Sequence, residues 1–164
     1  MKQRHPGTRA ESSASPATQL SAFLAKFEPA VARVVRAARA KLRKRMPTAN
    51  ELVYDNYNFF VIGYSPTERA SDSLISIAAA ANGVGLCFIR GAALADPDKL
   101  LSGSGKQTRF LRLPSADVLT QTGVDTLLTA ATEQAKTKMR SSGKGTLIIK
   151  SISAKQRPRR KGKT

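Results

Sequence analysis

The sequence predicts a single α+β domain, with an antiparallel sheet of about four to five strands and helices packed on one face of that sheet. Apolar residues recur at helical spacing through residues 20–46, whereas short apolar segments rich in β-branched and aromatic residues follow from residue 57. Helices, then several short strands, then a further long helix form an order typical of this class. A chain of 164 residues is long enough for one such domain with a substantial core.

The two ends of the chain differ in composition from its middle. Residues 1–16 and 154–164 are rich in Ser, Pro, Lys and Arg, and we predict that both are disordered tails. The domain is expected to span residues 17–153.

Two helices open the predicted domain. Pro29 stands at the start of the second helix, where a proline loses no hydrogen bond, and Pro47 ends it. Within the second helix one face is apolar and the opposite face is cationic. The cationic surface consists of Arg33, Arg36, Arg39, Arg43 and Lys44. It predicts a surface for nucleic acid or another polyanion, and the alternative is a solvated helix face, the usual meaning of a charge run.

A short helical turn is expected at residues 48–54, followed by a well-covered strand at 57–64. Residues 73–91 predict a hairpin around Asn82-Gly83, in which Ala81 pairs with Val84. This alternation places bulky side chains on one face of the hairpin and small ones on the other. The bulky face is Ile75, Ile77, Val84, Leu86 and Phe88, and the small face is Ser76, Ala78, Ala80, Gly85 and Cys87.

The second half predicts a turn into a short helix at 91–101, with Asp96 as its cap, and a strand at 107–115. A helix from Ser115, broken near Gly123, continues to residue 140. A last strand follows at 145–153.

The glycine-rich loop before the strand at 107–115 is a candidate anion site. Its backbone N–H groups and basic side chains could hold a phosphate or carboxylate, and the alternative is an ordinary connection with a solvated lysine. The candidate residues are Gly103, Gly105, Lys106, Arg109 and Arg112. The loop is not a nucleotide-binding P-loop, because Leu100 and Gln107 stand where that motif needs glycine and Ser/Thr.

Composition limits the chemistry. Lys and Arg number 28 against 11 Asp and Glu, and this net charge of +17 favours polyanionic partners. One cysteine, Cys87, and one histidine, His5, provide no disulfide, no Cys-rich metal site and no Ser-His-Asp triad. Glu51 and Asp55, four residues apart on the expected helical turn, are a candidate acid/base dyad or a solvated pair neutralised by Arg or Lys neighbours. We expect no catalytic residue, no metal and no cofactor.

The N-terminal sequence lacks the apolar core of a signal peptide, and no apolar run is long enough to span a bilayer. A cytoplasmic location is therefore expected. The sequence does not define an oligomeric state.

One stretch resembles a known family. The motif combines Asp96-Pro97, Leu100-Leu101 and Gly103-x-Gly105-Lys106-x-x-Arg109, and it is similar to the signature of the YdhG-like proteins, a bacterial family of unknown function. The resemblance covers roughly residues 20–140 and implies a small cytoplasmic α+β domain. One branch of that family has been described as frataxin-like iron chaperones. The cationic helix disfavours this role here, because iron prefers hard oxygen ligands.

Three functional hypotheses follow. The first is a non-enzymatic binding module whose Gly-Lys-Arg loop and arginine-rich helix contact an anionic ligand or partner. The second is a basic, nucleic-acid-associated protein in which the helix and the C-terminal tail supply the electrostatic surface. The third is an iron-handling or small-molecule enzyme role by analogy with the family.

Overall fold

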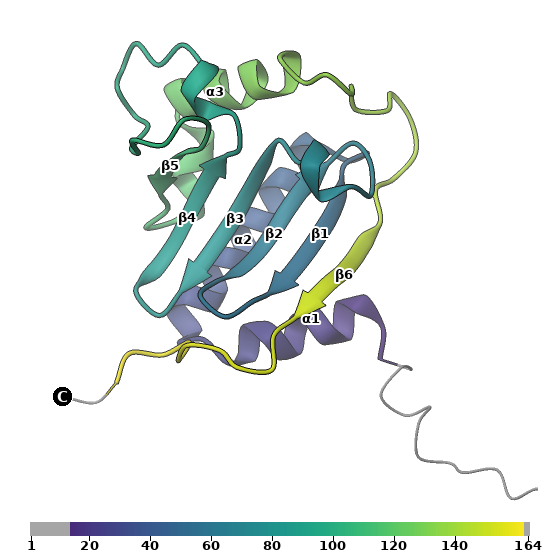
Figure 1. Cartoon of the computed structure of the whole chain (residues 1–164), viewed down its shortest axis with the longest axis vertical. Coiled ribbons are helices and arrows are strands. Elements are labelled where there is room, and N and C mark those ends of the chain that lie inside the picture. The colour runs from purple at the N-terminus through teal and green to yellow at the C-terminus, as the bar shows by residue number, and fades with distance from the viewer. Residues whose placement is uncertain (1–13, 163–164) are drawn as a thin grey trace, which may run out of the picture.

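The computed structural model describes residues 14–162 of the chain. Within them, three α-helices and a six-stranded sheet form the domain (Figure 1). The helices are α1 (Pro16–Ala25), α2 (Pro29–Arg45) and α3 (Thr122–Glu133), and the strands are β1 (Asn50–Asp55), β2 (Phe60–Ser65), β3 (Ile75–Ala80), β4 (Gly83–Phe88), β5 (Arg109–Arg112) and β6 (Leu147–Ile152). The predicted single α+β domain is confirmed, with one strand more than the upper end of the expected range.

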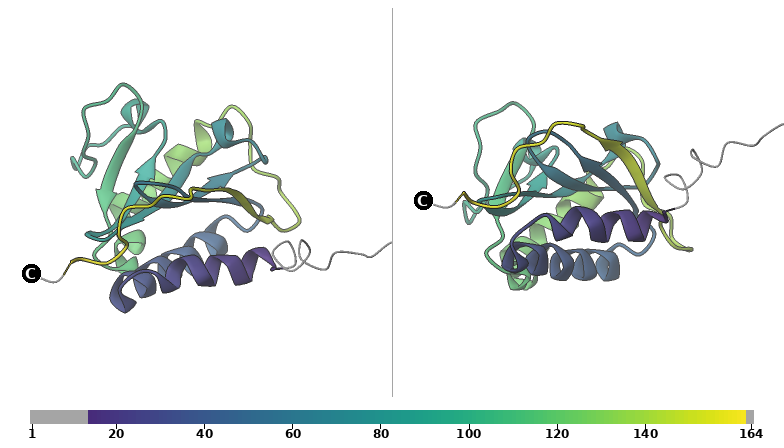
Figure 2. Two further views of the ribbon diagram at one scale, coloured as in Figure 1. Left: turned by 60° about the horizontal axis from the view of Figure 1, so that its bottom comes forward. Right: turned by 90° about the horizontal axis from the view of Figure 1, so that it is seen from below.

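The strands lie in the order β5-β4-β3-β2-β1-β6. Neighbouring strands are antiparallel except β6, which runs parallel to β1. The sheet is therefore mixed, because the long connection through α3 returns the chain to the β1 edge in the same direction as β1. The views in Figure 2 place α1 and α2 on one face of the sheet.

The two N-terminal helices form as their sequences predict. Ser15 caps α1 by accepting a hydrogen bond from the Thr18 N–H group, and Pro29 occupies the first turn of α2. Phe23 and Phe27 each pack against Phe60 of β2 with ring centroids 6.1 Å apart. These contacts hold α1 and the residues that follow it against the start of β2.

The helical turn expected at residues 48–54 is wrong, because Asn50–Asp55 form β1. Leu52 and Val53 are both fully buried, on opposite faces of the strand. β1 lies inside the sheet between β2 and β6. A strand covered on both faces has no alternating polar pattern to reveal it.

The β3–β4 hairpin differs from its prediction by two positions of register. Ala80 pairs with Gly83 and Ala79 with Val84, so that Ala81 and Asn82 form the turn. Gly83 takes a φ of +130°, which accounts for glycine there. A shift of two leaves every side chain on its predicted face, and the bulky face packs in the core.

The second half differs from the prediction at three points. No α-helix forms at 91–101, where a single 3-10 turn and loops lie instead, although both Asp96 carboxylate oxygens cap the backbone, at Leu100 and Leu101. The helix break lies at Gln121, and α3 ends at Glu133 rather than at residue 140. Met139, which was expected on this helix, packs against the core from the segment that follows it.

The C-terminal segment also differs from its prediction. Residues 154–162, expected to be a disordered tail, pass the end of α1 and the turn between β1 and β2 (Figure 1). Arg159 is 5% exposed in this segment. Of the predicted N-terminal tail, residues 1–13 lie outside the described part of the chain.

Candidate nucleic-acid interface

Two buried carboxylates on β1 organise the charged residues around the sheet. Glu51 is 4% exposed and Asp55 is fully buried, and both face the helices because residues four apart on a strand share a face. They do not form an acid/base dyad, since each is bound by its own cations. Basic neighbours neutralise both carboxylates, as the alternative expected, but the two are buried and not solvated.

Glu51 pairs with two of the predicted surface arginines, of which Arg39 is partly buried and Arg43 stays exposed. Arg39 donates two hydrogen bonds to the Glu51 carboxylate, at 2.9 and 3.0 Å, and the Arg43 Nε atom lies 3.5 Å from it. The Tyr64 hydroxyl donates a third hydrogen bond at 3.0 Å. Burial and the neighbouring Glu51 carboxylate raise the pKa of Tyr64 well above 10.0, so this hydroxyl remains a donor at neutral pH.

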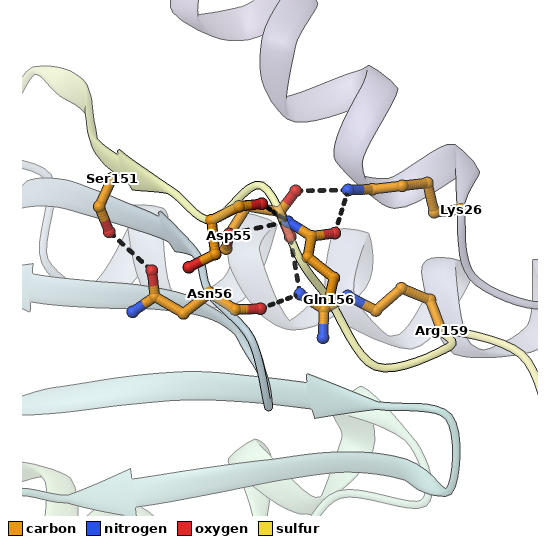
Figure 3. A network of polar contacts seen from close by, with 7 residues as sticks. Lys26, Asp55, Asn56, Ser151, Gln156 and Arg159 are labelled. Atoms are coloured by element: carbon orange, nitrogen blue, oxygen red, sulfur yellow. Dashed lines mark hydrogen bonds and ion pairs between the residues drawn. The ribbon is translucent and has the colours of Figure 1, made fainter.

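Asp55 fixes the end of the chain to the sheet (Figure 3). Its carboxylate accepts from Lys26 Nζ at 2.5 Å and from Arg159 Nη2 at 2.9 Å. The Asp55 backbone carbonyl accepts from Gln156 Nε2 at 2.8 Å, and Gln156 Oε1 accepts from Lys26 at 2.7 Å. The network joins α1, β1 and the C-terminal segment.

We call residues 153–162 the C-terminal strap. Its backbone donates from Ser153 to the Asp55 carbonyl and from Arg157 to the Tyr57 carbonyl, both at 2.9 Å. Arg160 donates to the carbonyl oxygens of Ala25 and Lys26 at the C-terminal end of α1. A cation at this end of a helix is favourable, because unpaired carbonyls leave it partly negative.

An open groove lies where the strap passes the β1–β2 and β3–β4 turns. Its charged lining residues are Arg157, Arg160 and Lys161 from the strap. No carboxylate of the described residues lines it. Arg112 brings a further cation to the same end, since its Nη2 atom donates to the Asn82 carbonyl at 3.1 Å.

Two aromatic side chains are exposed beside these cations. Tyr57 is 48% exposed and Phe59, which lines the groove, is 49% exposed. The guanidinium carbon of Arg157 lies 5.7 Å from the centre of the Tyr57 ring, within cation–π range. We call this group the sheet-end surface: Tyr57, Phe59, Arg112, Arg157, Arg160 and Lys161.

The predicted anion loop is not assembled as expected. Arg109 pairs with Phe88 and Arg112 with Gly85, so the two arginines, three positions apart on β5, point to opposite faces of the sheet. The Arg109 guanidinium is occupied by the loop's own carbonyls, at 2.5 Å from Gly105 and 2.9 Å from Thr108. Lys106 is exposed.

The glycines of that loop also have different environments. Gly103 has a φ of +126°, a conformation that explains a glycine without any ligand. A side chain at Gly105 would meet open space, because no atom lies within 4 Å of where its Cβ would stand.

The helix surface is divided as well. Arg33, Arg36 and Lys44 are exposed and make no ion pair with another described residue. Arg39 and Arg43 turn to Glu51, as described above. Three of the five predicted cations therefore have no carboxylate partner among the described residues, while Arg43 is paired but remains exposed.

Sequence reasoning missed the sheet-end surface because Tyr57 and Phe59 were assigned to a strand. Both lie in the turn before β2, which closes with a hydrogen bond from the Asn56 N–H group to the Phe59 carbonyl at 3.0 Å. Asn56 and Asn58, on either side of Tyr57, were the available turn signal.

Neither the Cys87 thiol nor a cluster of metal ligands provides a further site among the described residues. Burial raises the pKa of the Cys87 thiol, opposed in part by a hydrogen bond from Ser76, and this leaves it a poor nucleophile at neutral pH. Between residues 14 and 162, no three His, Cys, Asp or Glu side chains lie close enough to hold a metal ion together. In the same range, no helix combines the length and apolar character needed to cross a membrane.

Comparison of the chain with protein-family models, curated proteins and solved structures finds no match. The resemblance to the YdhG-like family therefore stays a prediction from its loop motif.

Proposed function

We propose that this protein is a non-enzymatic binding module and that its anionic partner is a nucleic acid. The observation that carries the proposal is the sheet-end surface. Arg157, Arg160 and Lys161 line the groove beside the half-exposed rings of Tyr57 and Phe59, and Arg112 donates to the carbonyl of Asn82 at the edge of that groove. Cations bind phosphates and release counterions, while rings offer contacts to bases.

The fixed position of the strap supports this assignment. A basic tail that is ordered only on binding loses conformational entropy at that moment, which weakens association. Here Arg159 and Gln156 hold the strap on Asp55, so Arg157 and Arg160 are already in place. Preorganised cations of this kind favour binding over a freely moving tail.

The other hypotheses have less support. The two arginines of the predicted anion loop are not brought together, because Arg109 and Arg112 lie on opposite faces of β5. For iron handling, the two buried carboxylates, Glu51 and Asp55, are engaged by cations. The exposed cations of α2 are the alternative surface for the same nucleic-acid partner.

Two variants of equal charge test which surface binds. One replaces the strap cations, Arg157→Ala, Arg160→Ala and Lys161→Ala, and the other replaces Arg33→Ala, Arg36→Ala and Lys44→Ala on α2. Fluorescent DNA and RNA are titrated with the wild-type protein and each variant over a salt series. For a single strand, the strap variant is expected to lose about 2 units from the slope of log K against log salt, since each phosphate contact contributes roughly 0.7.

The helix variant is the matched control, because it loses the same three charges elsewhere on the surface. Equal losses in both variants would indicate attraction to net charge without a defined site. Loss only in the helix variant would move the interface to α2. If the wild-type protein binds neither DNA nor RNA at moderate salt, the proposed function is wrong. Urea unfolding of each variant shows whether its domain is intact.

A further inference from the structure

The sheet-end surface has a feature that duplex binding does not require. Within residues 14–162, only Tyr57, Phe59, Phe110 and Ile152 are large apolar or aromatic side chains with more than two fifths of their surface exposed. Two of these four lie on the same short turn, where polar residues are the usual choice. Two exposed rings on one turn indicate a partner with flat apolar faces.

From this placement we infer that the sheet-end surface binds an unpaired nucleic-acid strand, with bases stacked on Phe59 and Tyr57. The inference rests on the proposed function and specifies its substrate class. In a duplex the faces of the bases are covered by their neighbours, whereas a single strand can turn them outward onto aromatic rings. Stacking of this kind is tolerant of sequence, because every base has a π-face.

The cations are arranged to serve the same strand. Arg157 lies over the Tyr57 ring, and guanidinium planes themselves stack on bases. Arg160 and Lys161 line the groove with Phe59, where phosphates of the same strand would meet positive charge. The surface thus places stacking platforms and phosphate contacts side by side.

Hydrogen bonds also hold the C-terminal strap against the turn that carries Tyr57 and Phe59. The Arg157 N–H group donates to the Tyr57 carbonyl at 2.9 Å, which fixes the strap to the aromatic turn. Two residues further, Arg159 Nη2 donates to the Asn56 carbonyl at 2.5 Å. Rings and cations therefore keep their spacing before the strand arrives.

The test compares single and double strands with aromatic variants. The probes are labelled oligothymidylate and oligouridylate of about 12 nucleotides, and a mixed-sequence DNA duplex of about the same length. Phe59→Ala is expected to weaken binding of both single strands about tenfold, as loss of one stacked base does, and to leave duplex binding unchanged. Tyr57→Ala is expected to act in the same direction. Comparing the thymidylate and uridylate arms shows whether DNA or RNA is preferred.

Phe110→Ala is the matched control, because Phe110 is 42% exposed and lies on β5 outside the groove. It should bind all probes as the wild-type protein does. If Phe59→Ala and Phe110→Ala have equal effects, or if Phe59→Ala weakens single and double strands alike, the stacking inference is wrong. A wild-type protein that binds duplex and single strands with salt-dependent affinity, unaffected by either aromatic variant, leaves the proposed function standing without the inference. Failure to bind any probe overturns both.

Discussion

Arg159 follows Asp55 by 104 positions in the chain, yet its Nη2 atom donates a 2.9 Å hydrogen bond to the Asp55 carboxylate. The two side chains are 3% and 0% exposed. The Arg159 guanidinium also lies 5.7 Å from the centre of the Phe27 ring, which connects the pair to the helices. Its Nε and Nη1 atoms have no partner among the described residues, so the Asp55 contact and the Asn56 carbonyl carry its hydrogen bonding.

We expect Arg159→Ala to lower the free energy of unfolding by about 3 kcal/mol, because removing one partner of a buried ion pair leaves the other charge poorly compensated. Lys26 remains beside Asp55, but its side chain is 41% exposed and compensates less than the buried arginine does. Urea unfolding monitored by circular dichroism measures the change.

Arg157→Ala is the control for this prediction, since it removes an exposed arginine of the same strap. Its stability should equal that of the wild-type protein. Equal stability of all three proteins would show that the strap is not held by Asp55. The result also bears on binding studies. Deleting the strap after Ala154 removes Arg159 together with the exposed cations, so a deletion changes stability and binding at once.

Gly145 gives a second stability prediction. A Cβ at this position would lie 1.7 Å from the Ala49 carbonyl oxygen, and the other near atoms also belong to the Ala49–Asn50 backbone, which leaves little room to relax. Gly145→Ala is expected to cost at least about 3 kcal/mol, and it should detach the segment that leads into β6. Thermal unfolding measures the cost, and hydrogen exchange at Glu51, whose N–H donates to the Thr146 carbonyl, reports the detachment.

Gly105→Ala serves as the contrast. Gly105 has open space around a built Cβ and no positive φ, so alanine should leave stability unchanged or raise it by up to about 1 kcal/mol. Similar losses in Gly105→Ala and Gly145→Ala would mean that the close approach at Ala49 does not limit the second position.

The sequence predicts the elements whose signals are local. The apolar stripe of α2 and the alternating hairpin residues depend on neighbours a few positions away, and both form with the expected faces. The parallel pairing of β6 with β1 depends on a partner about 95 positions distant, and no local pattern encodes it. Fold class is therefore predictable here while sheet order is not.

The candidate site was harder to predict for the same reason. A run of arginines and lysines looks alike whether its members are solvated or buried, and only the fold shows that Arg159 meets Asp55. Arg109 and Arg112 are close in sequence but lie on opposite faces of β5. Spacing along the chain suggested a cluster that the pleat of the strand separates.

Tyr64 provides a prediction on pH. Burial and the Glu51 carboxylate raise its pKa well above the ordinary value of 10.0, so above pH 10.0 the unfolded chain loses this proton while the folded chain keeps it. The unfolded state then binds fewer protons than the folded state, and the free energy of unfolding falls as pH rises, by at most about 1.4 kcal/mol per pH unit for this group. Below pH 10.0 the group contributes no pH dependence.

Tyr64→Phe isolates this contribution. At neutral pH the variant should lose about 1 to 2 kcal/mol, because Glu51 loses a hydrogen-bond donor. From pH 8 to about pH 10 that difference should stay constant, and from there to pH 11 it should shrink, since only the wild-type protein has the Tyr64 proton to lose on unfolding. Guanidinium unfolding of both proteins across this range measures the difference. Burial also raises the pKa of Tyr54. Tyr54→Phe is therefore the control that removes the contribution of Tyr54 to the pH dependence of unfolding. A difference between wild type and Tyr64→Phe that stays constant through pH 11 would show that Tyr64 ionises equally in the folded and unfolded states.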